Sequence, residues 1–380
     1  MESFLTGIHE YLLPFVVTLS IVVFVHEFGH YWVARRCGVR ILEFSIGFGP
    51  EIWGRTFKKS GVRWKLSALP LGGYVRMFGD ADPASTPDKA VYVMSDADKK
   101  VSYFHQNVWK RIAIAVAGPG ANFLFAIVLM TGLFMTYGQP YSPPLAEVIQ
   151  PNTAVAEAGM KPGDRVTMMG GQAIETFADI KKIMLLNLGE PIEFEVLREG
   201  EKVKLTVTPR MTEKVDRFGM THKISWLGIG VNELAFRKLS FVNAVKTSFT
   251  EIWDVSGETL VAVKQIILGM RSTDELGGAI RIAKMTGDIV KEKSLPDFIW
   301  FVVVISLNLG LVNLFPIPLL DGGHIMFYLI EAVRRKPLSE RAQEYAARVG
   351  ITIVASLLVF TTWNDLVQIS VISYFKQWLF

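Results

Sequence analysis

Four apolar segments, each long enough to cross a lipid bilayer, constrain the fold of this chain more than any other feature. A helix rises about 1.5 Å per residue, so roughly 20 apolar residues cross a hydrocarbon core of about 30 Å. The segments lie at about residues 11–34, 112–137, 298–320 and 349–370. We therefore expect an α-helical polytopic membrane protein with about four transmembrane helices.

The rest of the chain is too polar to lie in lipid. The 380 residues are 50% hydrophobic and 20% charged, which predicts membrane segments together with at least one aqueous domain. The formal net charge is only +4, and no dense basic run with interleaved aromatic residues occurs. We therefore expect a protein that contacts the lipid bilayer and no nucleic acid.

The basic residues predict an orientation in the membrane. Residues 1–10 hold no Lys or Arg, whereas residues 35–111 hold fourteen. The connection after the third apolar segment carries five more, namely Arg334, Arg335, Lys336, Arg341 and Arg348. By the positive-inside rule these two connections are cytoplasmic, so both termini and residues 138–297 lie outside.

The first apolar segment contains the run His26-Glu27-Phe28-Gly29-His30. On a helix, His26 and His30 lie one turn apart on the same face. This is the H-E-x-x-H pattern, in which two histidines bind zinc and the glutamate takes a proton from the zinc-bound water. An ionisable side chain in a transmembrane helix costs at least roughly 2.5 kcal/mol unless it is paired or bound. A metal site therefore explains the run better than a chance match does.

A catalytic zinc needs at least one further protein ligand. Cys37 is the single cysteine of the chain, which excludes a Cys-rich zinc site. Asp321 ends the third apolar segment, and both this segment and the first run from outside to inside, so the predicted ligands meet in the cytoplasmic half of the membrane. His324 competes as the third ligand, and a solvated helix end is the alternative for Asp321.

The residues before Asp321 predict a broken helix. Pro316 and Pro318 interrupt the helix and leave backbone groups that line a cavity or meet a substrate. Asn313, eight residues before Asp321, is predicted to donate to a substrate carbonyl. Helix packing through a polar side chain is the alternative for Asn313.

Residues 61–78 predict a membrane-associated β-hairpin. Two stretches of alternating apolar and polar residues flank Gly72 and Gly73, and Tyr74 opens the second stretch. We expect Gly72, Gly73 and Tyr74 to offer a strand edge to an extended substrate. An ordinary solvated hairpin is the alternative.

Residues 140–211 predict a small β-rich module. A hairpin turns at Glu199-Gly200, a helix covers about 177–188, and Gly159, Gly163 and Asp164 form a loop that could present backbone N–H groups. The order of these elements resembles a PDZ domain of the bacterial protease kind. An amphipathic helix is expected at 240–268.

These features divide the chain into four regions. Residues 1–137 and 298–380 form two parts of a membrane metalloprotease core, residues 140–211 form an extracytoplasmic PDZ-like α+β domain, and residues 212–297 form an extracytoplasmic linker with the amphipathic helix.

Together with Ala117-Gly118-Pro119 and Asn122, these motifs resemble the site-2 protease family of intramembrane zinc metalloproteases. The resemblance is greatest to its bacterial regulator-of-sigma-E protease branch, although several members of that branch carry two tandem PDZ domains and this chain has room for one. It implies Zn²⁺ held by His26, His30 and Asp321, with Glu27 as general base.

The resemblance also implies a cellular role. It implies that the chain resides in the bacterial inner membrane and cleaves single-span membrane proteins, such as anti-sigma factors or signal-peptide remnants, near the cytoplasmic face. An upstream site-1 protease first trims the same substrate outside.

Two other functions agree with part of the pattern. A membrane metal transporter also places histidines and acids within membrane helices, but it predicts ligands spread across the bilayer. A PDZ-bearing scaffold with a structural metal predicts four protein ligands rather than three.

Overall fold

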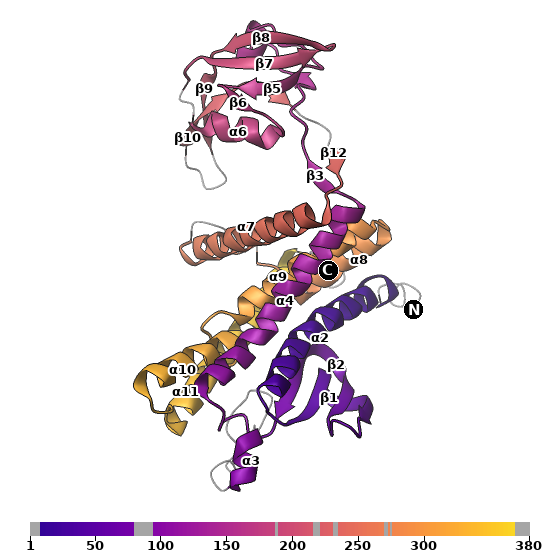
Figure 1. Ribbon diagram of the computed structural model, residues 1–380, viewed down its shortest axis with the longest axis vertical. Helices are drawn as coiled ribbons and strands as arrows, with labels where there is room; N and C mark the ends of the chain where they lie inside the picture. The colour runs from indigo at the N-terminus through magenta and orange to yellow at the C-terminus, as the bar shows by residue number, and fades with distance from the viewer. Residues whose placement is uncertain are drawn as a thin grey trace, which may run out of the picture. The chain divides into compact units, whose positions relative to one another are not determined.

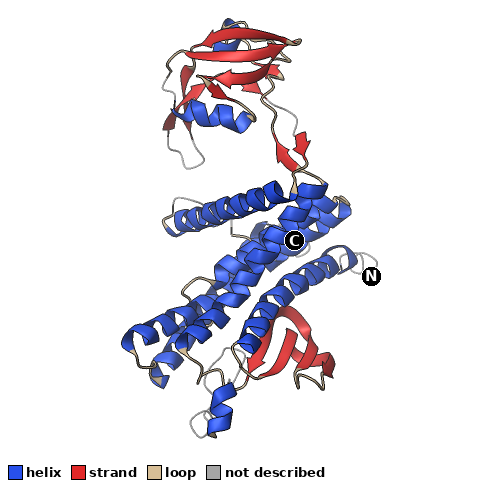
Figure 2. Cartoon of the chain, viewed as in Figure 1, coloured by secondary structure: helices blue, strands red, loops and turns tan. Residues whose placement is uncertain are grey.

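A computed structural model of the chain shows two compact units (Figures 1 and 2). The structure describes residues 8–79, 94–186, 189–215, 221–230, 235–269, 273 and 276–368. The helical unit comprises Met1–Gly132 and Val245–Phe380, and the β-rich module comprises Leu133–Ala244. The chain thus leaves the helical unit once and returns to it.

Four helices of the described chain are long and apolar enough to cross a membrane. They are α2 (Leu13–Arg36, preceded by the π-helical turn η1, Ile8–Leu12), α4 (Val108–Thr136), α9 (Leu295–Asn313) and α11 (Glu340–Gln368). Pro14 occupies the first turn of α2, where its missing N–H costs nothing, and Arg35 and Arg36 lie in the last turn beside the negative end of the helix dipole. The four predicted segments are therefore confirmed by length and composition.

The third apolar segment is shorter than predicted. Helix α9 ends at Asn313 rather than at residue 320, and a separate helix, α10 (Asp321–Arg334), begins at Asp321. The prolines at 316 and 318 lie in the turn between the two helices. Proline cannot continue α9, because it has no backbone N–H to donate and its ring clashes with the preceding helical turn. The fourth segment begins earlier than predicted, at Glu340, and residues 369–370 lie outside the described residues.

The predicted hairpin at 61–78 is wrong. Its two halves belong to one strand, β2 (Arg63–Met77), which pairs with β1 (Ile41–Thr56) instead of with itself. Phe44 of β1 pairs with Trp64 on one side and with Val75 on the other. Residues 41–46 therefore separate the two halves of β2, and residues 72–77 lie at an edge with which no other described strand pairs.

An apolar cluster fixes this sheet against α2 and α4. Phe44 is buried, and its ring stacks on Trp64 with centroids 4.2 Å apart. The cluster joins side chains of the sheet to those of the neighbouring helices, and its buried members include Tyr31, Val75, Ile114 and Tyr328. The position of the sheet edge relative to α2 therefore follows from side-chain packing.

Shorter helices complete the helical unit. These are α3 (Asp96–Val101) and α8 (Ala279–Lys291), which packs against η1, α2, α9 and α11. The amphipathic helix expected at 240–268 is present as α7 (Phe241–Ile267), which follows the β-rich module in the chain. Helix α8 was not predicted, and it lies in the stretch expected to be linker.

The β-rich module is built on a four-stranded sheet in the order β6-β5-β7-β8. Its strands are β5 (Arg165–Met169), β6 (Gln172–Ala173), β7 (Ile192–Arg198) and β8 (Glu201–Val207). The predicted hairpin at Glu199-Gly200 is confirmed, and both turn residues have positive φ, 51° and 93°. Helices α5 (Ala154–Glu157) and α6 (Phe177–Leu186) accompany the sheet, over a core that includes Val166, Phe194 and Val196.

The module is larger than the predicted 140–211, because later strands return to it. The pairs are β3 (Gln139–Tyr141) with β12 (Ala235–Arg237), β4 (Val148–Ile149) with β11 (Ile229–Gly230), and β9 (Arg210–Val215) with β10 (Thr221–Trp226). Buried Leu227 and Ile229 complete its core. Part of the predicted linker at 212–297 is therefore part of the domain.

Candidate metal centre

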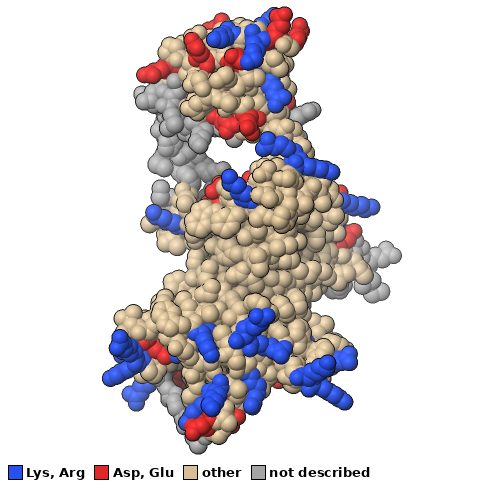
Figure 3. Space-filling view, in the orientation of Figure 1, with Lys and Arg blue, Asp and Glu red and all other residues tan. Residues whose placement is uncertain are grey.

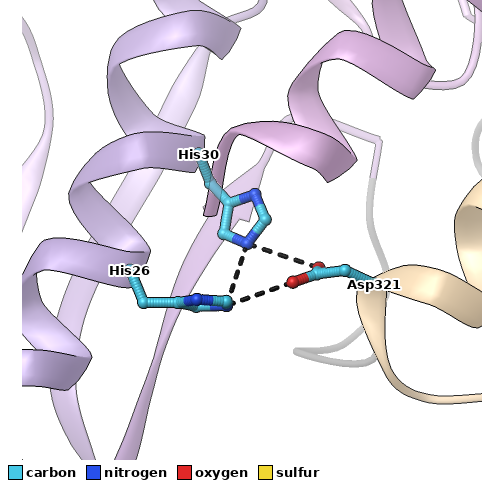
Figure 4. Close-up of side chains that lie close together, drawn as sticks. All are labelled: His26, His30 and Asp321. Carbon is cyan, nitrogen blue, oxygen red and sulfur yellow. Dashed lines mark hydrogen bonds and ion pairs between the residues drawn. The ribbon is translucent and has the colours of Figure 1, made fainter. Parts of the chain in front are cut away.

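Three side chains converge at one point inside the helical unit. His26 and His30 lie one turn apart on α2, both are buried, and their Nε2 atoms are 3.3 Å apart. The Asp321 carboxylate faces both rings, with Oδ2 3.1 Å from His26 Nε2 and Oδ1 3.3 Å from His30 Nε2 (Figure 4). The predicted ligand set therefore comes together in space.

The turn between α9 and α10 delivers Asp321. This residue is the first of α10, and the two glycines after it pack directly on the backbone of the turn. A Cβ on Gly322 would overlap the carbonyl of Phe315, and one on Gly323 would overlap that of Ile317. The sequence Asp-Gly-Gly thus brings the carboxylate close to α2 because the next two residues have no side chain.

The geometry and chemistry of these groups fit a zinc ion. Zinc holds nitrogen and oxygen ligands at roughly 2.0–2.2 Å in a tetrahedron, which places neighbouring ligand atoms roughly 3.3 Å apart. The three measured separations are 3.1, 3.3 and 3.3 Å. Apart from its ion pair with His26, Asp321 Oδ2 is buried without a hydrogen-bond partner among the described residues, as expected of an atom reserved for a cation.

The His30 ring is oriented for metal binding by the backbone. Its Nδ1–H donates to the carbonyl of Ile114 at 2.8 Å, which leaves the lone pair of Nε2 facing His26 and Asp321. Three protein ligands leave one position of a tetrahedron open, which is typical of a catalytic rather than a structural zinc site. The arrangement therefore disfavours a scaffold with a structural metal, and ligand atoms that all lie within 4.8 Å of one another disfavour a transport pathway.

Glu27 lies beside the ligands, in contact with the sheet edge. It lines the same cavity as His26, His30 and Asp321. A Cβ on Gly73 would lie 2.9 Å from Glu27 Cγ and 2.7 Å from the carbonyl oxygen of Ser45. Gly73 therefore lets the edge of β2 approach the carboxylate more closely than any other residue could.

The cavity has a volume of about 490 Å³. Its lining brings Gly72, Gly73, Tyr74 and Asn313 together with Glu27 and the ligands, as the sequence predicted. The other walls are mostly apolar and include Val23, Phe48, Val75, Met77, Ile114, Leu309, Leu319, Leu320 and Val354. Pro316 and Pro318 do not line it; they shape the turn, where the carbonyl of Pro318 contacts Gly350 of α11.

The hydroxyl of Tyr74 is held by side chains of the sheet. It donates to Glu43 Oε2 at 3.2 Å, and Lys65 Nζ donates to the same oxygen at 2.6 Å. Burial raises the pKa of Glu43, but the hydrogen bonds from Lys65 and Tyr74 outweigh it and hold that pKa below its ordinary value. The ring of Tyr74 stacks on Phe48, which also lines the cavity. The hydroxyl of Tyr74 is therefore engaged within the sheet, and the role of Tyr74 in substrate binding stays a prediction.

His324, the competing third ligand, lies outside the metal-binding group. It lines the cavity, but its ring stacks on Tyr328, with centroids 6.2 Å apart. Among the described residues, the group of side chains that could hold one ion is His26, His30 and Asp321. The geometry therefore favours Asp321 over His324 as the candidate third ligand.

Two residues of α4 were not predicted as site residues and complete the surroundings of the histidines. A Cβ on Gly118 would overlap His30 Nε2 and would lie 2.9 Å from His26 Cε1. Asn122, one turn later, is buried, and its amide lies 3.2 Å from His26 Nδ1. The spacing of a glycine and an asparagine by four residues in an apolar helix is the signal that could have found them.

The predicted peptide loop of the β-rich module uses its polar groups internally. Asp164 is buried and accepts hydrogen bonds from the backbone N–H of Lys161 at 2.8 Å and from Arg198 Nε and Nη2 at 2.8 and 2.7 Å. Arg198 also donates to the carbonyl of Gly159, and Gly159 and Gly163 have φ of 81° and 94°. These contacts stabilise the loop, and its role in peptide binding stays a prediction.

Comparisons with known proteins cover nearly the whole chain. The model of peptidase family M50 matches residues 14–357, which include all three residues of the metal centre. A protein of Agrobacterium fabrum that is named, provisionally, a zinc metalloprotease is 42% identical over 369 residues, 96% of this chain and 97% of its own. Metalloprotease MmpA of Caulobacter vibrioides is 36% identical in an alignment that covers 96% of this chain and 97% of its own.

Several solved structures are similar to part of the chain. One is the PDZ domain of the SdrC-like protein from Listeria innocua, and the similarity covers 25% of this chain and 99% of that domain. The sequence identity is 11% and the TM-score is 0.20.

Proposed function

We propose that this chain cleaves the transmembrane segments of single-span membrane proteins. The premise is that the chain belongs to peptidase family M50, the site-2 protease family, and is a multi-pass membrane zinc metalloprotease. Anti-sigma factors and signal-peptide remnants are the substrate classes, and an upstream site-1 protease acts on them first in regulated intramembrane proteolysis. The observation that carries the proposal is a single cavity that combines the three ligands, Glu27, a strand edge and apolar walls.

The chemistry of peptide hydrolysis divides between the metal and Glu27. Zinc, when bound by His26, His30 and Asp321, supplies Lewis-acid chemistry that polarises a carbonyl and acidifies a water. Glu27 accepts the proton from that water and passes it to the nitrogen of the leaving amine, which requires a carboxylate within reach of both. The amide of Asn313 lines the same cavity and donates to a substrate carbonyl.

The substrate reaches this chemistry as an extended segment. Amides within a helix are shielded by their own hydrogen bonds, so a transmembrane substrate must unwind before it is cut. Residues 72–77 lie at a sheet edge, and Gly73 places this edge against Glu27. An unwound segment that pairs with this edge has its backbone held beside the general base, and its apolar side chains fit the cavity walls.

The distribution of charge supports a cytoplasmic active site in the bacterial inner membrane. In the helical unit, Lys and Arg gather at the end that holds β1, β2 and α3, and the adjoining band carries few charges (Figure 3). His26 and His30 lie in the second half of α2, towards Arg35 and Arg36. By the positive-inside rule this end faces the cytoplasm, and the chain termini and the β-rich module lie outside.

The β-rich module acts outside the membrane as a single PDZ domain. A sheet flanked by α6, with loops shaped by glycine, is the kind of scaffold that adds a peptide as a further strand. In this position the module contacts the part of a substrate that an upstream protease has already trimmed.

The experiment that tests the proposed reaction uses Glu27→Gln. This side chain is nearly isosteric with the carboxylate but accepts no proton, so cleavage of a single-span reporter in vesicles should fall by about 10²–10⁴-fold. Zinc content, measured on the purified protein, should stay that of the wild type because the ligands are intact. Retention of cleavage by the zinc-loaded variant would exclude Glu27 as the general base.

A further inference from the structure

We propose that Asn122 is a positioning residue of the metal centre, whose amide oxygen accepts a hydrogen bond from Nδ1–H of His26 and so fixes the orientation and tautomer of that ring. Asn122 lies on α4 and is completely buried. As placed in the structure, its amide nitrogen Nδ2 lies 3.2 Å from His26 Nδ1, across a sequence separation of 96 residues. The contact therefore joins α4 to a zinc ligand on α2.

The chemistry of zinc binding decides which end of the amide faces the ring. His26 directs Nε2 at Asp321, so Nε2 must carry the lone pair that binds the metal and Nδ1 must carry the proton. A proton on Nδ1 needs an acceptor. The nitrogen and oxygen of an Asn side chain are interchangeable in position, and the hydrogen-bond network assigns them. We therefore exchange the two amide atoms of Asn122, which places its oxygen at Nδ1–H of His26.

The Nδ1–H groups of His26 and His30 have different kinds of hydrogen-bond acceptor. Nδ1–H of His30 donates to a backbone carbonyl, that of Ile114, which every residue type at position 114 would supply. Among the hydrogen bonds of the described chain, the partner of His26 Nδ1 is a side chain, Asn122. Substitution can thus remove the acceptor of one ligand while it leaves the acceptor of the other intact.

The surroundings of Asn122 hold it in place and reserve its side chain for His26. Ser306 Oγ on α9 donates to the backbone carbonyl of Asn122 at 3.1 Å, and Gly310 lets α9 approach so closely that a Cβ there would lie 3.3 Å from Asn122 Cβ. As placed in the structure, the amide oxygen of Asn122 is buried and has no hydrogen-bond partner among the described residues, and exchanging the two amide atoms gives it one, Nδ1–H of His26. A packing role alone would not require a buried amide with this one contact.

Gly118, one turn before Asn122, completes the arrangement. Its missing side chain leaves the space that the two imidazole rings occupy, because a Cβ there would overlap His30 Nε2. One turn of α4 therefore supplies both the space for the rings and the acceptor for one of them.

The test compares zinc affinity in variants of the full-length protein in detergent, by competition with a chromophoric chelator. Asn122→Leu has a similar size but no acceptor, and the loss of such a partner should weaken zinc binding by about 10–100-fold. Asn122→Asp keeps an oxygen acceptor at the same position, and its affinity should stay within about threefold of the wild type or exceed it. Thr131→Val, the matched control, removes another buried hydroxyl of α4, whose hydrogen bond goes to Ser248 rather than to the metal centre, and it should bind zinc as the wild type does.

A second measurement reports the ligand geometry itself. In the Co²⁺-substituted protein the visible d–d bands should be unchanged by Asn122→Asp and altered by Asn122→Leu. Should Asn122→Leu fail to fold, Asn122→Ala, which cannot overfill the site, replaces it in both measurements. Equal zinc affinity and equal spectra in the wild type and the acceptor-free variant would overturn the proposal, as would an Asp variant that binds as weakly as the acceptor-free one.

Discussion

Two aspartates of this protein, Asp164 and Asp321, show how a candidate metal ligand differs from a structural group. Asp164 in the β-rich module is held by three hydrogen bonds, from Arg198 and from the backbone of Lys161. Asp321 in the helical unit faces two imidazole nitrogens, and its buried Oδ2 has no hydrogen-bond partner among the described residues. Each is next to glycine in the sequence: Asp164 follows Gly163, and Asp321 precedes Gly322.

The difference lies in what satisfies the buried charge. A carboxylate that accepts hydrogen bonds from its own domain stabilises that domain and leaves no free oxygen. A carboxylate that faces the lone pairs of two histidines needs a cation between them. The same residue type in a similar loop therefore has a structural role in one unit and a chemical role in the other.

The largest expected effect comes from removing the carboxylate of the metal centre. Asp321→Ala takes away one of three ligands, so zinc measured after dialysis against a weak chelator should be lost, and cleavage of a membrane reporter with it. Arg198→Met, which disturbs the other aspartate, should keep its zinc. Equal zinc content in Asp321→Ala and the wild type would remove the distinction between the two sites.

A smaller effect is expected where the sheet edge meets Glu27. In Gly73→Ala the new Cβ would lie 2.9 Å from Glu27 Cγ and 3.0 Å from Val23 Cγ1, so the carboxylate must move. A displacement of about 1 Å can cost about 10²-fold in rate, and we expect cleavage to fall at least tenfold while zinc content stays unchanged. The control is Gly120→Ala on α4, whose Cβ would enter open space. Wild-type cleavage by Gly73→Ala would show that the edge does not set the position of Glu27.

The metal ligands could be predicted from the sequence because local rules determine them. Helical spacing places His26 and His30 on one face, and the cost of ionisable groups in a membrane helix indicates that they are bound. Asp321 followed from its place at the end of an apolar segment. We placed Asp321 beside the histidines because the first and third apolar segments run in the same direction. Asp321 lies there although it belongs to α10 and not to α9, because the turn at the two prolines is short.

Strand pairing could not be predicted in the same way. Alternation identified residues 62–66 and 74–78 as extended, but it does not name the partner of a strand. That partner is residues 41–56, where Gly47, Gly49 and Pro50 interrupt the apolar pattern. The role of Asn122 was missed for a related reason, since its contact with His26 depends on the packing of α4 against α2 and not on the sequence near either residue.

The smallest expected effect tests the structural aspartate. Arg198→Met leaves the buried carboxylate of Asp164 with its backbone donor alone, and should destabilise the β-rich module by about 1–3 kcal/mol at neutral pH. Lys202→Met is the control, because Lys202 is 70% exposed in its pair with Glu195, and surface pairs contribute roughly 0–1 kcal/mol. Hydrogen exchange of peptides from residues 139–215, measured in the full-length protein, reports the stability of the module.

The pair of Asp164 and Arg198 also predicts how the stability of the β-rich module responds to acid. Burial raises the pKa of Asp164, but hydrogen bonds from Arg198 and from the backbone of Lys161 outweigh it and hold that pKa below its ordinary value. A carboxyl group whose pKa is depressed in the folded state stabilises that state at pH values above its pKa in the unfolded chain, about 3.9. This contribution is lost as the pH falls through the pKa of the folded state. In Arg198→Met the depression shrinks, so most of the pH-dependent stabilisation from Asp164 should be absent, and exchange in the module should change less between pH 5 and pH 3 than in the wild type. An equal change in both proteins would mean that Arg198 does not set the pKa of Asp164.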